Sequence, residues 1–174
     1  MAKIELSTLN TASPEALVES LGAVYEHSPW VVERASLARP FPTLKALQAA
    51  CEGALYGASV ETQLELIRAH PDLAAKLDQL SELTEFSRQE QDRAGFMRLK
   101  PAELEALRDG LNTYRERFGH PFILCVLEHP ASDVLPILTV RVRADAEAER
   151  LACLYQIARI GWHRICSLVD DSNA

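Results

Sequence analysis

The sequence predicts an all-α protein with a single domain over residues 1–174. Apolar residues recur at helical spacing along most of the chain, and several of these runs begin at a serine, threonine or proline that is typical of a helix start. The hydrophobic fraction of 48% is ordinary for a folded protein and too high for a disordered one. No internal repeat or long linker divides the chain. We therefore expect one helical bundle.

Three helices are expected in the N-terminal part of the chain. Ser13-Pro14-Glu15 is typical of an N-cap, a first-turn proline and a first-turn acid. A second helix is expected to open at Pro42-Thr43, and a third to close near Ala69 because Pro71 follows it. The apolar positions expected on their buried faces are Leu17, Leu21, Val24, Leu44, Leu47, Cys51, Val60, Leu64, Leu66 and Ile67.

Three further helices are expected to begin at Ser87, at Pro101 and at about Ala146, the last running to Val169. The core positions expected on the second and third of these are Leu104, Leu107, Leu111, Leu151, Leu154, Ile157 and Ile165. Residues 137–142 are rich in β-branched side chains and would favour a strand if taken alone. Because a lone strand would have no partner, a helix is predicted there.

Charge and cysteine content narrow the class of protein. The net charge of -7 gives no broad attraction to nucleic acid or to an anionic membrane, and no apolar stretch is long enough to span a bilayer. The first residues, MAKIELSTLN, lack the apolar core of a secretory signal. We therefore expect a cytoplasmic protein whose four cysteines are reduced and mostly buried.

The first cluster that could carry chemistry is Arg68-Ala69-His70-Pro71-Asp72-Leu73. Proline disfavours helical geometry in the residue before it and suits the first turn of the next helix, so His70 is expected at a junction between helices. There its imidazole could face a cleft and transfer protons near neutral pH. The alternative is a histidine that only caps or fills the junction.

The second cluster is Ser87-Arg88-Gln89-Glu90-Gln91. Ser-x-x-Glu is the capping-box pattern, in which Glu90 would only reach back to the helix start. In the functional interpretation Ser87 still begins the helix, while Glu90 and Gln91 point into a site. A carboxylate near His70 would orient the imidazole and raise its pKa.

The third cluster runs from Tyr114 to Leu124. Gly119 is expected to end one helix in a left-handed conformation, and Pro121 to begin the next. The backbone N–H groups from Phe122 onward would then lie free at a helix N-terminus and could bind a carboxylate or carbonyl oxygen. An ordinary corner between helices with a packed aromatic core is the alternative, and it is compatible with ligand binding.

The fourth cluster is Arg159-Ile160-Gly161-Trp162-His163-Arg164-Ile165. Arginines on such a helix usually lie on a solvated face, and this is the expectation for Arg159. Gly161 would leave space on the face that carries Arg164, whose guanidinium could hold a carboxylate through two parallel hydrogen bonds. No zinc-binding histidine pair, phosphate-binding loop, dinucleotide fingerprint or nucleophile elbow occurs in the sequence, so we expect neither a metal nor an organic cofactor.

Taken together, these clusters resemble the family of 2-oxo-4-hydroxy-4-carboxy-5-ureidoimidazoline (OHCU) decarboxylases. The matching residues are His70-Pro71-Asp72-Leu73-Ala74, Ser87, Glu90-Gln91, Ala94-Gly95, Phe118-Gly119, Pro121-Phe122-Ile123, Ile160 and Arg164. Arg39-Pro40-Phe41 fits a weaker family element. The match runs in order through nearly the whole chain. The signal is the presence of four motifs in register.

The resemblance implies an all-helical bundle, paired as a homodimer, that needs no cofactor and acts on a small ureidoimidazoline rather than on nucleic acid or membrane. Its implied reaction is the decarboxylation of OHCU to (S)-allantoin, the last step of urate oxidation to allantoin. His70 would be the catalytic acid/base and Glu90 its partner. The residues implied to bind substrate are Pro71, Ser87, Arg88, Gln89, Gln91, Phe122, Ile123, Leu124, Cys125, Val126 and Arg164.

Two positions depart from the family pattern. Family members often carry an asparagine shortly after the arginine of the penultimate helix, where this chain has Arg141-Val142-Arg143-Ala144-Asp145. We expect this departure to change local capping. His120 stands where an aromatic or apolar residue is common and could change the rim of the pocket. The catalytic hypothesis requires the side chains of His70, Glu90 and Arg164 to converge. The rival hypotheses are a helical interaction module and a lyase for another ureide or small acid.

Overall fold

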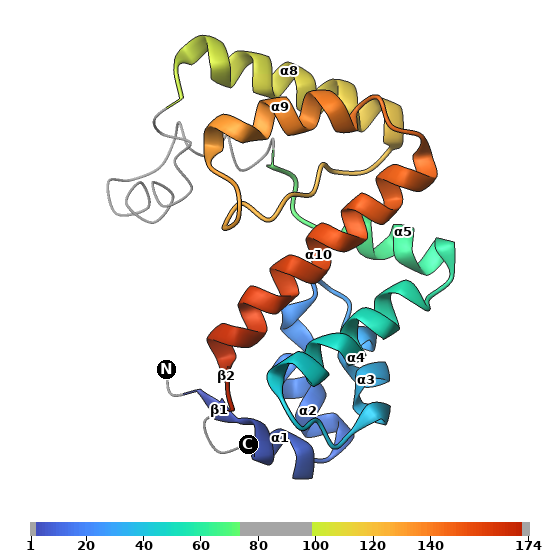
Figure 1. Cartoon of the computed structure of the whole chain (residues 1–174). Helices are drawn as coiled ribbons and strands as arrows, with labels where there is room; N and C mark the ends of the chain where they lie inside the picture. Colours follow the sequence, from blue (N-terminus) through green and yellow to red (C-terminus); the bar gives the residue numbers. More distant parts are fainter. Residues whose placement is uncertain (1–2, 74–98, 172–174) are drawn as a thin grey trace. The chain divides into compact units, whose positions relative to one another are not determined.

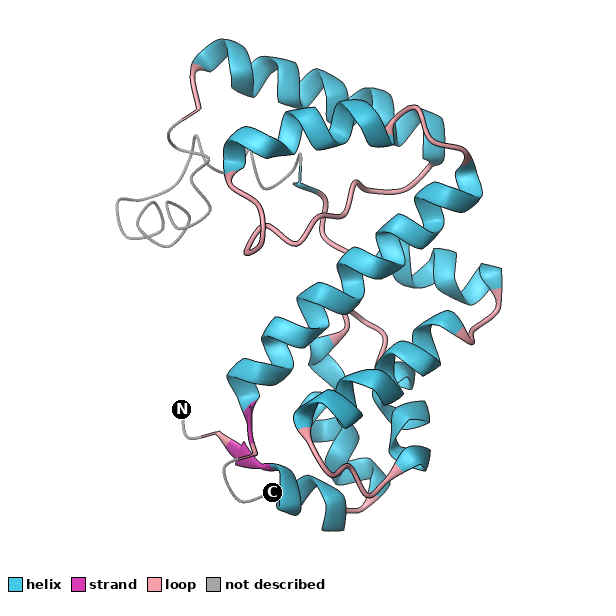
Figure 2. Cartoon of the chain, viewed as in Figure 1, coloured by secondary structure: helices cyan, strands magenta, loops and turns pink. Residues whose placement is uncertain are grey.

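The computed structural model describes residues 3–73 and 99–171 and contains, within them, eight α-helices and one pair of two-residue strands (Figures 1 and 2). The elements are β1 (Ile4–Glu5), α1 (Leu6–Thr11), α2 (Pro14–Leu21), α3 (Trp30–Ala35), α4 (Leu44–Tyr56), α5 (Val60–Ala69), α8 (Pro101–Phe118), α9 (Ala131–Arg141), α10 (Ala146–Leu168) and β2 (Val169–Asp170). The predicted all-α class is confirmed. Within the described residues, no helix combines the length and the apolar character that crossing a membrane requires.

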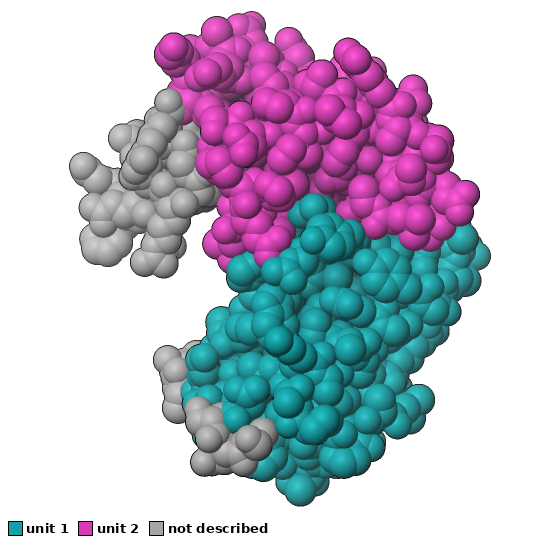
Figure 3. Space-filling view, viewed as in Figure 1, with its two compact units in different colours: residues 1–69, 154–174 teal, residues 70–153 magenta. Residues whose placement is uncertain are grey.

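The chain divides into two compact units, which are coloured separately in Figure 3. Unit 1 comprises Met1–Ala69 and Leu154–Ala174, and unit 2 comprises His70–Cys153. The boundary therefore falls within α10, between Cys153 and Leu154. That residues 1–174 act as one domain stays a prediction.

In unit 1, α3 packs against both α2 and α4, and the predicted helix starts are confirmed. The hydroxyl of Ser13 accepts a hydrogen bond from the backbone N–H of Ala16 at 3.2 Å, and that of Thr43 accepts one from Ala46 at 3.2 Å. Each hydroxyl satisfies a first-turn N–H that has no partner inside its helix. The fully buried side chains of this unit include Leu17, Leu21, Val31, Leu47, Cys51, Leu55 and Ile67.

Unit 1 differs from the prediction in several places, and neither α1 nor α3 was predicted. β1 pairs in parallel with β2, so that Ile4 lies opposite Val169 and Glu5 opposite Asp170. Strands of two residues are too short to show an alternating pattern in the sequence. The predicted core position Val60 is wrong, because its side chain is 54% exposed in the first turn of α5.

In unit 2, α8 and α9 pack together. The ambiguous segment, residues 137–142, is helical through Arg141, so the predicted helix is confirmed. The core of the unit consists of Leu107, Leu111, Tyr114, Phe122, Leu124, Ala131, Val134 and Leu138. The predicted core position Leu151 is wrong, because it is 43% exposed on α10. All four cysteines are free of disulfides, and three of them are buried, as expected.

Candidate functional site

His70 directly follows the last residue of α5, so the helix ends where the following proline predicts that it should. The histidine is 8% exposed and belongs to unit 2. At this exposure, protein atoms rather than solvent surround the imidazole. The structure thus buries His70 at the predicted junction, and its role in proton transfer stays a prediction.

The segment after His70 is anchored to the end of α8. Arg115 donates to the Asp72 carboxylate at 2.7 Å, with Asp72 15% exposed and Arg115 58% exposed. A pair this exposed on one side contributes little to stability, although it links this segment to α8. Leu73 packs against the core of unit 2 that includes Phe122 and Leu124. The first and third clusters of the sequence are therefore brought together.

Gly119 ends α8 with a φ of +70°, the left-handed conformation predicted for it. The prediction that a helix begins at Pro121 is wrong. Residues 121–125 form an irregular connection, and the next helix, α9, begins only at Ala131. Four consecutive apolar residues, Phe122–Cys125, are all buried there. A surface helix would bury only one of its faces, whereas here four consecutive side chains are buried. The N–H groups from Phe122 onward therefore do not form a helix N-terminus.

A buried polar network braces this connection. Arg141, on α9, donates from Nη1 to the carbonyl oxygen of Ile123 at 2.6 Å. Its Nε lies 3.0 Å and 3.2 Å from the two carboxylate oxygens of Glu149, and its Nη2 lies 2.5 Å from Oε1. The Tyr114 hydroxyl also donates to Glu149 Oε1, and Cys153 accepts from Arg141 Nη2 at 3.3 Å. Helices α8, α9 and α10 are thereby tied to one carbonyl of the connection.

Burial, hydrogen bonds and neighbouring groups shift the pKa values of Tyr114, Cys153 and Arg141. Burial raises the pKa of the Tyr114 hydroxyl and raises that of the Cys153 thiol to about 11, although the Arg141 guanidinium opposes the shift at Cys153. Burial alone would lower the pKa of Arg141, but the hydrogen bonds to Glu149 and the neighbouring Cys153 outweigh it and the pKa is raised. Near neutral pH, Tyr114 is therefore a donor and Arg141 a cation facing Glu149.

The structure describes both segments in which the chain departs from the family pattern. The Asp145 carboxylate accepts from the Ala148 N–H at 2.8 Å and so caps the start of α10. His120 is 5% exposed, and its ring packs against Tyr114 and Phe118 with centroids 5.7 Å and 5.9 Å apart. His120 is thus part of the aromatic core.

Arg164 belongs to unit 1. Its Nη1 donates to the carbonyl oxygen of Val24 at 2.8 Å, and its Nη2 lies 2.5 Å from Glu26 Oε1. The predicted space beside Gly161 is filled by Tyr25, because a Cβ added to Gly161 would lie 2.7 Å from both Cζ and the hydroxyl oxygen of that ring. The glycine therefore admits the tyrosine, next to which Val24 and Glu26 meet the guanidinium.

Replacing Gly161 with alanine is expected to destabilise the protein by about 1–3 kcal/mol, because the buried Tyr25 ring cannot yield easily. The thermal unfolding midpoint would measure the effect. Gly53→Ala is the matched control, since a Cβ at Gly53 on α4 meets nothing within 4 Å. That control is expected to be neutral or stabilising by less than about 1 kcal/mol. Equal stability of the two variants would contradict the close packing of Tyr25.

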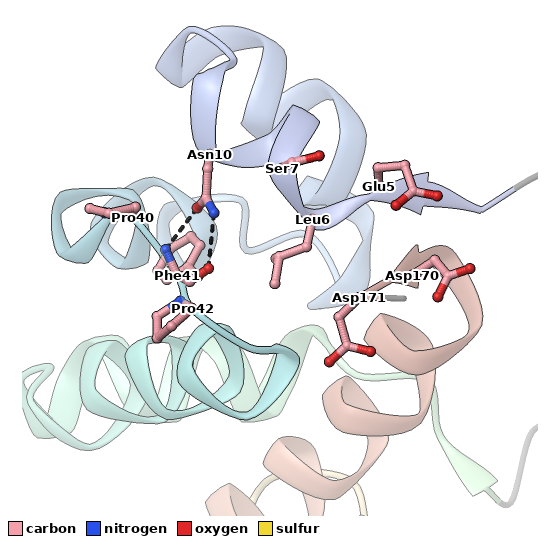
Figure 4. A pocket seen from close by; sticks show the side chains of 9 residues that line it. All are labelled: Glu5, Leu6, Ser7, Asn10, Pro40, Phe41, Pro42, Asp170 and Asp171. Atoms are coloured by element: carbon pink, nitrogen blue, oxygen red, sulfur yellow. Dashed lines mark hydrogen bonds between the residues drawn. The ribbon is translucent and has the colours of Figure 1, made fainter. Parts of the chain in front are cut away.

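The weaker element Arg39-Pro40-Phe41 has a structural role in unit 1. Arg39 donates from Nη1 to the carbonyl oxygens of Leu9 and Ala12 at 3.3 Å and 2.6 Å, at the end of α1. The Asn10 amide brackets the backbone of Phe41, accepting from its N–H at 2.7 Å and donating to its oxygen at 2.9 Å (Figure 4). An open pocket of about 470 Å³ lies beside these residues. None of the predicted site residues lines it.

The residues of the second cluster, Ser87, Arg88, Gln89, Glu90 and Gln91, lie outside the described residues. His70 and Arg164 belong to different units. The convergence of His70, Glu90 and Arg164 on one substrate therefore stays a prediction.

Sequence reasoning missed the bracing network, although one signal of it was present. Glu149, Cys153 and Ile157 recur four residues apart on α10, and all three are buried. A glutamate within the apolar face of a helix requires a buried cation or donor. Nothing local identified Arg141 as that cation.

Comparison with known proteins adds a family match. The family model described as OHCU decarboxylase matches residues 10–166. The 2-oxo-4-hydroxy-4-carboxy-5-ureidoimidazoline decarboxylase of Halalkalicoccus jeotgali is 36% identical over 157 residues, which cover 90% of this chain and 87% of the relative. The uric acid degradation bifunctional protein PucL of Bacillus subtilis is 33% identical over 166 residues, 95% of this chain but 33% of that protein.

A solved structure shows the same fold. The crystal structure of (S)-allantoin synthase matches with a TM-score of 0.76 and 29% sequence identity. The match covers 98% of this chain and 56% of the chain compared. The sequence and the fold therefore point to the same group of proteins.

Proposed function

The chain belongs to the OHCU decarboxylase family, and we propose on that premise that it decarboxylates OHCU to (S)-allantoin, the last step of urate oxidation to allantoin. The observation that carries the proposal is the family match over residues 10–166, which includes every proposed site residue. The enzyme is a carboxy-lyase.

The substrate supplies its own electron sink. Its carboxylate is attached to a carbon that also bears a hydroxyl and that lies next to a ring C=N bond. When the bond to carbon dioxide breaks, the electron pair moves toward that C=N bond, and the ring nitrogen of that bond takes up a proton. The hydroxyl then loses its proton as its carbon becomes a carbonyl, and a proton is added to one face of the neighbouring carbon. The protein has to orient the carboxylate, stabilise the developing charge and transfer protons, so we propose that no cofactor takes part.

We assign proton transfer to His70, with Glu90 as the group that polarises it. An imidazole can take the hydroxyl proton and return a proton to carbon within the same turnover. Because protonation has to occur on one face to give (S)-allantoin, a histidine with a fixed ring suits the task. The burial of His70 just after α5 supports this assignment.

We propose that Arg164 binds the anionic or ureido oxygens of the substrate. The backbone of residues 122–126 would bind its ring or ureido groups. The remaining proposed contacts are Pro71, Ser87, Arg88, Gln89 and Gln91. Glu26 already pairs with Arg164, which orients the guanidinium and partly neutralises it. A substrate anion would share that cation with Glu26.

We further propose that residues 1–174 act as one catalytic domain, that the enzyme is a homodimer, and that it works in the cytoplasm. The family match crosses the boundary between the two units, which supports a single domain. The resemblance to the family supports the dimer, and the unbridged cysteines agree with a reducing compartment. Light scattering on the purified protein would measure the oligomeric state, and a monomer would contradict the second of these proposals.

The test of the function is an assay with freshly generated substrate. Urate is passed through uricase and hydroxyisourate hydrolase, and allantoin is followed by circular dichroism. Because OHCU decays slowly in water to racemic product, the expected result is rapid formation of one enantiomer. Product that forms no faster than in the protein-free control, and without handedness, would contradict the proposal. That outcome would favour the helical interaction module.

A further inference from the structure

We propose that Arg141 is a positioning residue, which fixes the peptide group between Ile123 and Leu124 so that its N–H is held as a donor to the substrate. The inference rests on the proposed function, in which the backbone of residues 122–126 binds substrate. It adds to that proposal Arg141, a residue of α9 that orients this backbone.

Arg141 contacts the connection in two ways. Its Nη1 donates to the carbonyl oxygen of Ile123 at 2.6 Å, a short charge-assisted hydrogen bond. Its guanidinium also lies over the ring of Phe122, with Cζ 4.6 Å from the ring centroid. One side chain thereby fixes a backbone carbonyl and the side chain that precedes it.

The guanidinium itself has little freedom to move. Two of its nitrogens bind the Glu149 carboxylate, which is fully buried, and Nη2 also donates to Cys153. Tyr114 holds the same carboxylate from α8. A planar guanidinium with all three nitrogens engaged cannot rotate without breaking several hydrogen bonds. The orientation is therefore set by three helices.

Fixing a carbonyl also fixes the N–H of the same peptide. In a planar trans peptide the C=O and N–H bonds point in opposite directions, so the N–H of Leu124 points away from Arg141. Leu124 is 7% exposed. Across residues 3–73 and 99–171, no protein group accepts a hydrogen bond from this N–H. Buried donors without a protein partner are rare, and one held at a fixed angle is suited to a ligand.

The geometry predicts a particular kinetic signature. An N–H that binds ring or ureido groups, away from the bond that breaks, holds the substrate and the transition state equally. Loss of its orientation should therefore raise KM and leave kcat nearly unchanged. A residue that only stabilised the fold would lower the amount of active enzyme and leave KM as it was.

The test replaces Arg141 with lysine, which keeps the charge but cannot hold Glu149 and the Ile123 carbonyl with the same planar fork. We expect KM to rise about tenfold, as for the loss of one hydrogen bond to substrate, with kcat within about twofold of wild type. Rates are taken well below the unfolding midpoint of each variant. The matched control is Arg143→Lys, an exposed arginine two residues further on, whose KM should not change.

The outcomes separate the inference from the function on which it rests. A wild-type protein that forms no (S)-allantoin contradicts the proposed function itself. An active wild type together with a folded R141K variant of unchanged KM overturns only the role of Arg141. If R141K does not fold, Tyr114→Phe decides, since it keeps the buried ring and removes one donor to Glu149. A raised KM in Y114F supports the inference, and an unchanged KM overturns it.

Discussion

Replacing His70 with glutamine is expected to lower kcat/KM for OHCU by about 10²- to 10⁴-fold, the usual contribution of a positioned acid/base group. Glutamine is similar in size to histidine and keeps a polar group at this buried position, but it cannot exchange protons near neutral pH. The initial rate of (S)-allantoin formation, followed by circular dichroism, measures the loss. Residual product should also be closer to racemic, because protonation from water has no preferred face.

The same reasoning predicts that His70 and Glu90 act as one unit. Glu90→Gln should lower kcat, and the double variant should be little worse than H70Q alone, because groups that act together are not additive. His129→Gln is the control, a half-buried histidine with no proposed role in proton transfer. A folded H70Q enzyme with the activity of the control would remove His70 from the mechanism.

Much of the fold could be predicted because its signals are local. The N-caps Ser13 and Thr43 act on N–H groups three residues away, so the pattern and the hydrogen bond occupy the same few residues. Gly119 and the proline after His70 end their helices for equally local reasons. The sequence therefore located these four helix ends correctly, whereas it predicted neither α1 nor α3.

The wrong predictions arose where distant residues decide. Gly-His-Pro is a sound local signal for a new helix, yet residues 121–125 are irregular, and all four apolar side chains that follow the proline are buried. Gly161 suggested open space on its helix, but Tyr25, which is distant in the sequence, occupies that space. Neither outcome can be read from neighbouring residues, because each depends on which segment packs opposite.

The candidate site shows the same division. His70 and its proline could be recognised as a motif, whereas Glu149 could be assigned a role only with its partners in view. Its carboxylate is fully buried on α10 and is bound by side chains from α8 and α9. A buried charge is tolerated only when it is paired, and the sequence alone does not identify the partners of Glu149.

Replacing Glu149 with leucine is accordingly expected to destabilise the protein by about 3–5 kcal/mol, because it leaves Arg141 charged in a mostly buried position. The free energy of unfolding in urea measures the change. Glu147→Leu is the control on the same helix, where the glutamate is exposed, and it should cost less than about 1 kcal/mol. An E149L variant as stable as that control would contradict the buried ion pair.

Removing the charges of both Arg141 and Glu149 separates their effect on stability from the orientation of the Ile123 carbonyl. In the double variant Arg141→Met with Glu149→Leu, no unpaired charge remains, so part of the lost stability should return although the Tyr114 hydroxyl still lacks its acceptor. The Ile123 carbonyl has lost its donor in the same variant, so KM for OHCU should stay raised about tenfold. Recovered stability with a raised KM is expected only if Arg141 orients the backbone that binds substrate. Recovery of both would reduce the network to a support of the fold.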